Sequence, residues 1–258
     1  MKSAVMVFCL LLSTLGQANS REYNTITQVS SYNGLLAGLY DSVATYAELE
    51  GAGDTGVGTF DRLDGEMVML DGVLYRIGFD GKITVMPPET PTPYATLVNF
   101  NADKTMAIAR NAGRDDAAAA MKEALVNPNL PHAVLLKGTF AHIKCRSIPQ
   151  QSRPYPTLME IAANQAVFDG NNVKGTIVGF YYPGFAGAFN VPGFHLHFLN
   201  DARDFGGHVL DFTVGDDVVA LIDECDKLVV RLPNTDDSKV VDMEKDRSAD
   251  LQKVNRDK

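Results

Sequence analysis

Short apolar runs separated by Asp-Gly pairs characterise the first third of the chain. The pairs at residues 64–65, 71–72 and 80–81 each lie between two such runs. Asp-Gly is strongly preferred in two-residue hairpin turns, because both central positions need a positive φ. The pattern therefore predicts an antiparallel meander with strands at Gly58–Arg62, Glu66–Leu70, Val73–Phe79 and Lys82–Met86.

Helical spacing of apolar residues is confined to a few segments. It predicts helices over residues 31–44, 114–125 and 158–166, the second of which ends before Asn127-Pro128. Gly138 separates two β-rich runs, which predicts a hairpin of strands 133–137 and 139–148.

The second half of the chain reads mostly as strands. Strands are expected there at residues 176–181, 194–199, 208–213 and 227–232. One further strand is expected in the first half, at residues 94–100. The Pro-rich segment Pro149–Pro156 is the best candidate for a boundary. The sequence thus predicts a mixed α+β fold with two β-rich halves and flanking helices, divided into residues 21–150 and 151–258.

The N-terminus has the pattern of a signal peptide. Lys2 precedes an apolar stretch, Ala4–Leu15, and small residues follow at Ala18 and Ser20. The stretch is too short to span a bilayer and no later segment is apolar enough to do so. We therefore expect residues 1–20 to be removed, and the mature chain to be secreted, or periplasmic in a bacterium, with no membrane span.

The net charge of the chain indicates which kinds of molecule it can bind. The 258 residues carry a formal net charge of -9 and a pI of about 5.0, which argues against a nucleic-acid-binding protein. An acidic protein needs local positive charge to bind an anionic small molecule, either from a metal ion or from Arg. Cys145 and Cys225 remain after removal of the signal, and sequence spacing alone leaves a disulfide between them open.

Three of the five histidines fall within Gly193–Phe212. His195 and His197 are two residues apart, so on a strand their side chains share one face. Gly206-Gly207 can close a hairpin that brings His208 opposite His197. Three imidazoles from paired strands form a triangular base for a catalytic metal ion with one open position, and zinc suits such ligands. Unrelated core or surface histidines are the alternative interpretation.

Nearby acids complete this hypothesis. Asp201, Asp204 or Asp211 could accept hydrogen bonds from the rings and orient them. His132 and His142 lack such neighbours, and for them an ordinary structural role is favoured. The sequence contains no dinucleotide fingerprint or phosphate-binding loop, so no organic cofactor is expected.

Four blocks of the chain resemble the alpha-acetolactate decarboxylase family. They are GVGTFDRLDGEMVMLDGVLYRI, GTFAHIKCRSIPQQSRPYPTL, NVKGTIVGFYYP and, most specifically, GFHLHFLNDARDFGGHVLDF, which begin at residues 56, 138, 172 and 193. The blocks occur in the family's order, and the resemblance extends from about Gln28 to Leu232.

The resemblance implies a zinc-dependent enzyme of two domains, with one Zn2+ per chain and a possible homodimer. It places the metal ligands at His195, His197 and His208, and further active-site residues at Arg146 and Glu66. The family also uses a Glu near its C-terminus. In this chain Asn255 falls near that position, with Asp250 and Asp257 as alternative acids.

The implied reaction converts 2-acetolactate to acetoin and CO2. Loss of CO2 leaves electrons that the adjacent ketone can accept as an enediolate, which a metal chelated by the ketone and hydroxyl oxygens stabilises. Arg146 suits the substrate carboxylate. Glu66 lies on the same face as Val68 and Leu70, and an apolar setting raises a carboxyl pKa into the range of a proton donor. Without the resemblance, a solvated Glu at a strand end would be favoured for Glu66, and an Arg paired with a structural acid is the alternative for Arg146. The alternatives are a catalytically impaired zinc-binding homologue and a lyase for a related 2-hydroxy-3-keto acid.

Overall fold

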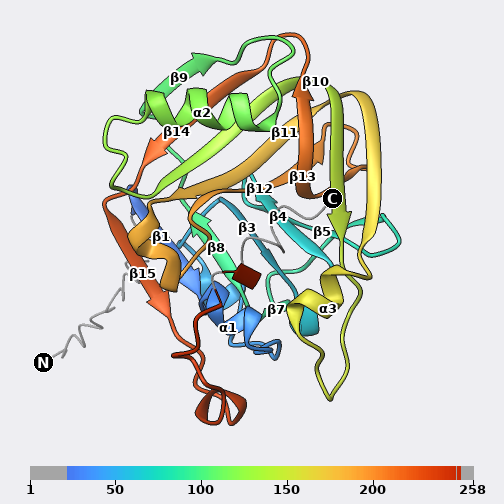
Figure 1. Cartoon of the computed structure of the whole chain (residues 1–258), viewed down its shortest axis with the longest axis vertical. Helices are drawn as coiled ribbons and strands as arrows, with labels where there is room; N and C mark the ends of the chain where they lie inside the picture. The colour runs from blue at the N-terminus through green and yellow to red at the C-terminus, as the bar shows by residue number, and fades with distance from the viewer. Residues whose placement is uncertain (1–21, 248, 251–258) are drawn as a thin grey trace, which may run out of the picture.

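The computed structural model describes residues 22–247 and 249–250, so the expected signal peptide lies outside the described residues. Two β-sheets form the frame of the molecule (Figure 1). The seven-stranded sheet has the order β15-β1-β8-β3-β4-β5-β6, and the six-stranded sheet has the order β11-β12-β13-β10-β14-β9. Strands dominate and helices are few, which confirms the predicted mixed fold of β-rich character.

The seven-stranded sheet contains the predicted meander, but its first strand is Thr55–Thr59 and not Gly58–Arg62, because Arg62 and Leu63 take positive φ values and turn the chain. Three hairpins in sequence pair β3 with β4, β4 with β5 and β5 with β6, all antiparallel. The sheet is completed by β1 and β8 and, through a parallel pairing with β1, by β15 from the end of the chain. Its strands are β1 Thr25–Val29, β3 Thr55–Thr59, β4 Glu66–Leu70, β5 Val73–Ile77, β6 Ile83–Val85, β8 Ala95–Val98 and β15 Lys227–Arg231.

Four strands of the second sheet close into a ring. β11 pairs with β12 on one side and with β10 on the other, while β13 pairs with both β12 and β10. β14 and β9 extend the sheet from the first part of β10. The strands are β9 Lys104–Ala107, β10 His132–Ser147, β11 Ala166–Tyr182, β12 Gly193–Asn200, β13 Gly206–Val214 and β14 Val219–Glu224.

The hairpin predicted around Gly138 is wrong. β10 runs without interruption through this residue and pairs along its whole length with β11. Gly138 has a φ of 153°, and a Cβ there would come within 2.7 Å of the backbone of Asp217 and Val218. Glycine is therefore needed because two segments approach closely, and not because the chain reverses.

The helices are short apart from one. Among the described residues the α-helices are α1 Tyr32–Leu36, α2 Arg114–Ala124 and α3 Leu158–Ala162, and the 3-10 helices are η1 Ala47–Leu49, η2 Asp61–Leu63, η3 Gly184–Ala188 and η4 Asp237–Lys239. The helix predicted over residues 31–44 ends at Leu36, because Gly38 takes a φ of 91° and turns the chain. No helix within the described part of the chain is long and apolar enough to cross a membrane.

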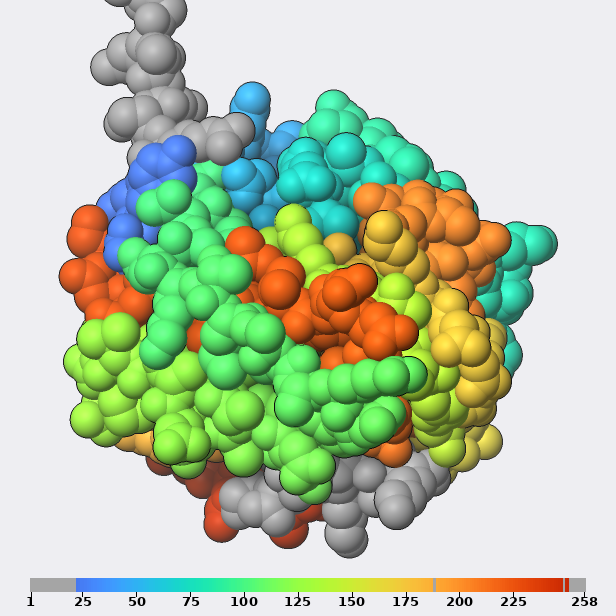
Figure 2. All heavy atoms as spheres, turned by 90° about the horizontal axis from the view of Figure 1, so that it is seen from above, coloured from blue at the N-terminus to red at the C-terminus, as the bar shows by residue number. Residues whose placement is uncertain are grey.

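Two apolar cores lie on opposite faces of the ring. Helix α2 covers one of them through Ala117 and Met121, which pack with Phe140, Phe198 and other ring residues. Figure 2 shows this covering segment in green against the orange strands of the same face. The other core lies between the two sheets and combines side chains of both, including Val57, Val68, Val178, Phe180 and Leu199.

Each large sheet contains strands from both halves of the sequence. β15 joins the seven-stranded sheet from beyond the Pro149–Pro156 segment, and β10 joins the ring from before it. The expected division into domains near residue 150 stays a prediction. A small two-stranded sheet, β2 Ala44–Thr45 with β7 Pro91–Thr92, is separate in its backbone pairing, but Ala44 shares an apolar cluster with Val29 and Leu97 of the seven-stranded sheet.

Candidate metal centre and active site

Strand pairing places the three predicted histidines together. His197 on β12 lies directly opposite His208 on β13, as the hairpin pattern predicts. On the other side of β12, His195 pairs with Phe180 and His197 with Val178. Phe180 and Val178 belong to the core between the sheets, so the two histidines face the seven-stranded sheet while Leu196 and Phe198 face the opposite core.

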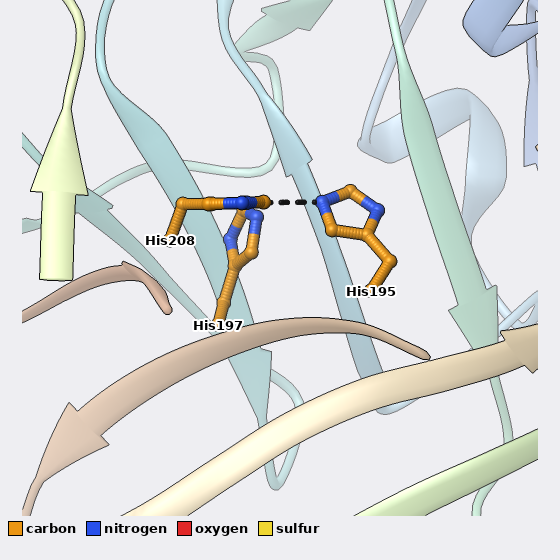
Figure 3. Close-up of side chains that lie close together, drawn as sticks. All are labelled: His195, His197 and His208. Atoms are coloured by element: carbon orange, nitrogen blue, oxygen red, sulfur yellow. Dashed lines mark hydrogen bonds between the residues drawn. The ribbon is translucent and has the colours of Figure 1, made fainter. Parts of the chain in front are cut away.

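The three rings converge on one point (Figure 3). Their centroids are 5.0, 5.1 and 5.2 Å apart, and one potential ligand atom from each lies within 4.8 Å of the other two. All three residues are at most 5% exposed. This is the only group of its kind that the described residues contain.

The hydrogen-bonding state of the rings fits a bound metal ion. Each ring has one buried nitrogen without a hydrogen-bond partner: Nδ1 of His195, Nε2 of His197 and Nε2 of His208. His195 Nε2 and His208 Nδ1 lie 3.2 Å apart. Two ligands of a tetrahedral ion with bonds of 2.0–2.1 Å would be about 3.3 Å apart. An ion bound by this pair and by His197 Nε2 would satisfy the His197 nitrogen, whereas His195 Nδ1 and His208 Nε2 would remain without a partner among the described residues.

A backbone carbonyl of the other sheet orients one of the rings. His197 Nδ1 lies 2.8 Å from the carbonyl oxygen of Met67 on β4. A protonated Nδ1 donates to this oxygen and leaves Nε2 free to bind a metal. The acids considered from the sequence do not have this role: Asp204 accepts from Asn200, and Asp211 accepts from the amide of Phe212.

Burial keeps the three histidines neutral, which is the form that binds a metal. Desolvation is the largest cause in each case and lowers the pKa of His197 to about 3. It also lowers the pKa of His195 and His208, with further contributions from the charge of Arg146 and from the neighbouring rings. The triad is therefore ready to bind a cation throughout the neutral range.

Arg146 and Glu66 lie beside the triad. Arg146 on β10 is the cross-strand neighbour of His208, and Glu66 begins β4 directly after the Asp64-Gly65 turn. Arg146 Nη1 donates to Glu66 Oε1 at 3.1 Å, and both side chains are at least nine-tenths buried. Glu66 Oε2 lies 3.6 Å from His197 Nε2, too far for a hydrogen bond. Arg146 Nε is buried without a partner, so a donor remains for an anionic ligand.

The environment of Glu66 favours its protonated form. Desolvation raises its pKa to about 7, and the charge of Arg146 opposes this shift. A carboxylic acid with such a pKa exchanges protons readily near neutral pH. This agrees with the apolar strand face on which the sequence places Glu66.

A pocket joins all five predicted site residues. It is small and partly open to solvent. Sequence reasoning missed most of its wall, because these apolar side chains come from distant segments. The lining residues are Tyr32, Leu35, Gly58, Thr59, Leu63, Glu66, Tyr94, Arg146, Ile148, Leu158, His195, His197 and His208.

Other candidates lie elsewhere. His142 is partly exposed and pairs with Asp169, and His132 contacts Leu130 and Glu224 away from the pocket. Cys145 and Cys225 are free and belong to different cores. Asn255 and Asp257, considered for the C-terminal acid, lie outside the described residues. Asp250, the other candidate, is described but does not line the pocket.

Replacement of a triad histidine should remove the metal site. We expect wild-type protein to retain one divalent ion per chain after dialysis, and His197→Ala to bind it more weakly by a factor above about 100. Elemental analysis and chelator competition measure this. His142→Ala is the matched control, because His142 lies outside the pocket. A stoichiometric ion in His197→Ala would contradict the assignment.

The raised pKa of Glu66 should make the metal-free protein sensitive to pH. A carboxyl whose pKa is raised on folding stabilises the fold below its ordinary pKa of 4.5, and this contribution is lost as pH rises toward 7. Between about pH 5 and about pH 7.5, chelator-treated wild type should therefore lose on the order of 2 kcal/mol of stability relative to Glu66→Gln. The histidines titrate in both proteins, so urea unfolding of the pair isolates Glu66. Parallel pH profiles would show that Glu66 does not titrate in this range.

The chain is similar in sequence to proteins of one family. The family model described as Alpha-acetolactate decarboxylase matches residues 26–245. A protein of that name from Methanosarcina mazei is 38% identical over 235 residues, covering 90% of this chain and 81% of that protein. One from Brevibacillus brevis is also 38% identical, covering 85% and 77%.

Solved structures agree with the sequence comparison. The crystal structure of alpha-acetolactate decarboxylase from Bacillus subtilis strain 168 superposes with a TM-score of 0.86 at 34% identity, covering 90% of this chain and 99% of that one. The similarity includes both sheets and the strands that hold the pocket residues, since it extends over most of the chain. The chain therefore belongs to the alpha-acetolactate decarboxylase family.

Proposed function

We propose that this chain catalyses the metal-dependent decarboxylation of 2-acetolactate to acetoin and CO2. The observation that carries the proposal is the meeting, in one pocket, of three buried histidines with orphan nitrogens and a buried Arg–Glu pair. Family membership supports the substrate, because the similar proteins from several organisms bear the name alpha-acetolactate decarboxylase.

His195, His197 and His208 would hold one Zn2+ per chain. Imidazole nitrogens suit zinc, and three protein ligands leave a position for substrate. When bound, the ion supplies Lewis-acid stabilisation to the negative charge that develops on the hydroxyl and ketone oxygens of the substrate as the enediolate forms.

Arg146 would bind and orient the substrate carboxylate. Its Nε has no partner and its Nη1 is fixed on Glu66, so the guanidinium is held in place with a donor to spare. The bond between C1 and C2 of the substrate breaks, C1 leaves as CO2, and the electron pair moves into the enediolate. Burial strengthens the interaction of Arg146 with the carboxylate before this step.

Glu66 would supply the proton that completes the product. In the metal-free pocket burial raises its pKa to about 7, so a large share of the side chain holds a proton near neutral pH, whereas a bound cation would lower this pKa. Transfer of that proton to C2 of the enediolate gives acetoin and leaves the Glu66 carboxylate, which Arg146 stabilises until water returns a proton. One proton is consumed for each CO2 released from the substrate anion.

Purified protein should convert racemic 2-acetolactate to acetoin. Bound zinc is confirmed first by elemental analysis, and acetoin is then measured with and without chelator. We expect chelator to abolish turnover and added Zn2+ to restore it, because the ion provides the electrophile. Zinc-loaded protein that forms no acetoin would indicate an impaired zinc-binding homologue. Preference for another 2-hydroxy-3-keto acid in a substrate panel would indicate a related lyase.

Arg146 and Glu66 should differ in their kinetic signatures. Arg146→Ala should lower kcat/KM by about 100-fold, since it removes a charged hydrogen bond to the carboxylate. Glu66→Gln should lower kcat by about 100- to 10,000-fold, since it removes the proton donor. Both variants should keep zinc, and His142→Ala should match wild type. Unchanged kinetics in either variant would reject the role of that residue.

We also propose export and homodimer formation, which rest on the N-terminal sequence and the family. Mass spectrometry of protein recovered outside the producing cytoplasm should find a chain that begins after Ser20. Light scattering should give twice the monomer mass. A retained N-terminus would refute export, and a monomer mass would refute the dimer.

A further inference from the structure

The connection between β3 and β4 contains two consecutive residues in the left-handed backbone region. Arg62 has a φ of 56° and Leu63 a φ of 60°, and neither is glycine. Bulky side chains rarely adopt this conformation, which tends to occur at functional sites and lasts only where the surrounding structure enforces it.

Contacts on both sides hold this connection in place. The amide of Arg62 donates to the carbonyl of Tyr40 at 2.9 Å, and the carbonyl of Arg62 accepts from the amide of Gln151 at 2.8 Å. One residue beyond Leu63, Asp64 accepts hydrogen bonds from Arg76 through its carbonyl oxygen and its carboxylate. The backbone around Leu63 is therefore fixed by three separate segments.

The fixed backbone directs the Leu63 side chain into the pocket. Leu63 is 1% exposed and forms an apolar wall with Leu35, Ile148 and Leu158. The amide of Gly65 donates to the carbonyl of Leu63 at 2.8 Å, which ties this wall residue to the turn that presents Glu66. Charged and metal-binding groups share the pocket with this wall, so the alkyl groups of a bound substrate must pack against it.

We propose that Leu63 is a specificity-determining residue that limits the size of the alkyl group on C2 of the substrate. The inference rests on the proposed function and assigns the pocket wall that selects among 2-hydroxy-3-keto acids. Leu63 cannot retreat from a longer substituent, because Tyr40, Gln151 and Arg76 hold its neighbours. Hydrophobic pockets of this kind discriminate one methylene by roughly 10- to 200-fold.

The test compares two substrates in the zinc-loaded protein. One is 2-acetolactate, and the other carries an ethyl group in place of the C2 methyl group. The measured quantity is the ratio of kcat/KM for the ethyl substrate to that for the methyl substrate. Leu63→Ala and Leu63→Gly should each raise this ratio by about tenfold or more, because they open space at the wall.

Leu36→Ala is the matched control. Leu36 belongs to the same apolar cluster and is 8% exposed, but it is not among the described residues that line the pocket. Leu36→Ala loosens the packing of the cluster but adds no space to the pocket. The ratio of kcat/KM for the ethyl substrate to that for the methyl substrate should therefore stay at the wild-type value. Thermal unfolding tests the backbone argument: Leu63→Gly should be at least as stable as Leu63→Ala, the reverse of the usual order, because glycine tolerates a positive φ.

The possible results distinguish a failure of the role proposed for Leu63 from a failure of the proposed decarboxylase activity. An unchanged ratio in folded, active Leu63 variants would overturn the role of Leu63 and leave the decarboxylase proposal intact. The same rise in Leu36→Ala would also overturn it, by showing that general loosening is sufficient. Absence of CO2 release from both substrates by zinc-loaded wild type would overturn the proposed function and this inference with it.

Discussion

The register of three neighbouring strands is the constraint on which the site depends. β10, β13 and β12 align Arg146, His208 and His197 in one row across the ring, and strand alternation adds His195 on the same face. A shift of one residue in any of these strands would turn a site residue into the opposite core, where Phe198 and Val209 lie. The apolar residues that alternate with the histidines thus fix the positions of the polar ones. The strand register that packs the apolar core therefore also brings the site residues together.

The site gathers groups that a protein interior ordinarily excludes. A buried ion pair, three neutral imidazoles and four orphan nitrogen atoms lie within one pocket between the sheets. Such groups are costly to bury without partners, so the surrounding apolar cores must provide the stability that the pocket lacks. Each group nevertheless has a fixed position before any ligand arrives, and burial has already shifted the pKa values of Glu66 and the three histidines. This is the preorganisation that electrostatic catalysis requires.

Much of this arrangement can be predicted from the sequence, for reasons that differ between elements. The Asp-Gly turns and strand alternation are local signals, so the meander and the positions of His195, His197 and His208 follow from spacing. The placement of Arg146 and Glu66 required the family resemblance, because their contact joins residues 80 positions apart. Gly138 has the sequence signature of a turn, but the same glycine signature results from its close approach to Asp217. The Met67 carbonyl and the wall residue Leu63 carry no sequence signal, because one is main chain and the other depends on an unusual backbone conformation.

The hydrogen bond between His197 and Met67 has a consequence for the molecule as a whole. It connects the ring to the seven-stranded sheet at the point where the imidazoles meet. Occupancy of the triad and association of the two layers are therefore thermodynamically linked, and whatever strengthens one must strengthen the other by an equal free energy. All three imidazoles belong to the ring, so a cation held there would act on the other layer only through this hydrogen bond, and a higher free concentration of the ion would raise the free energy of unfolding.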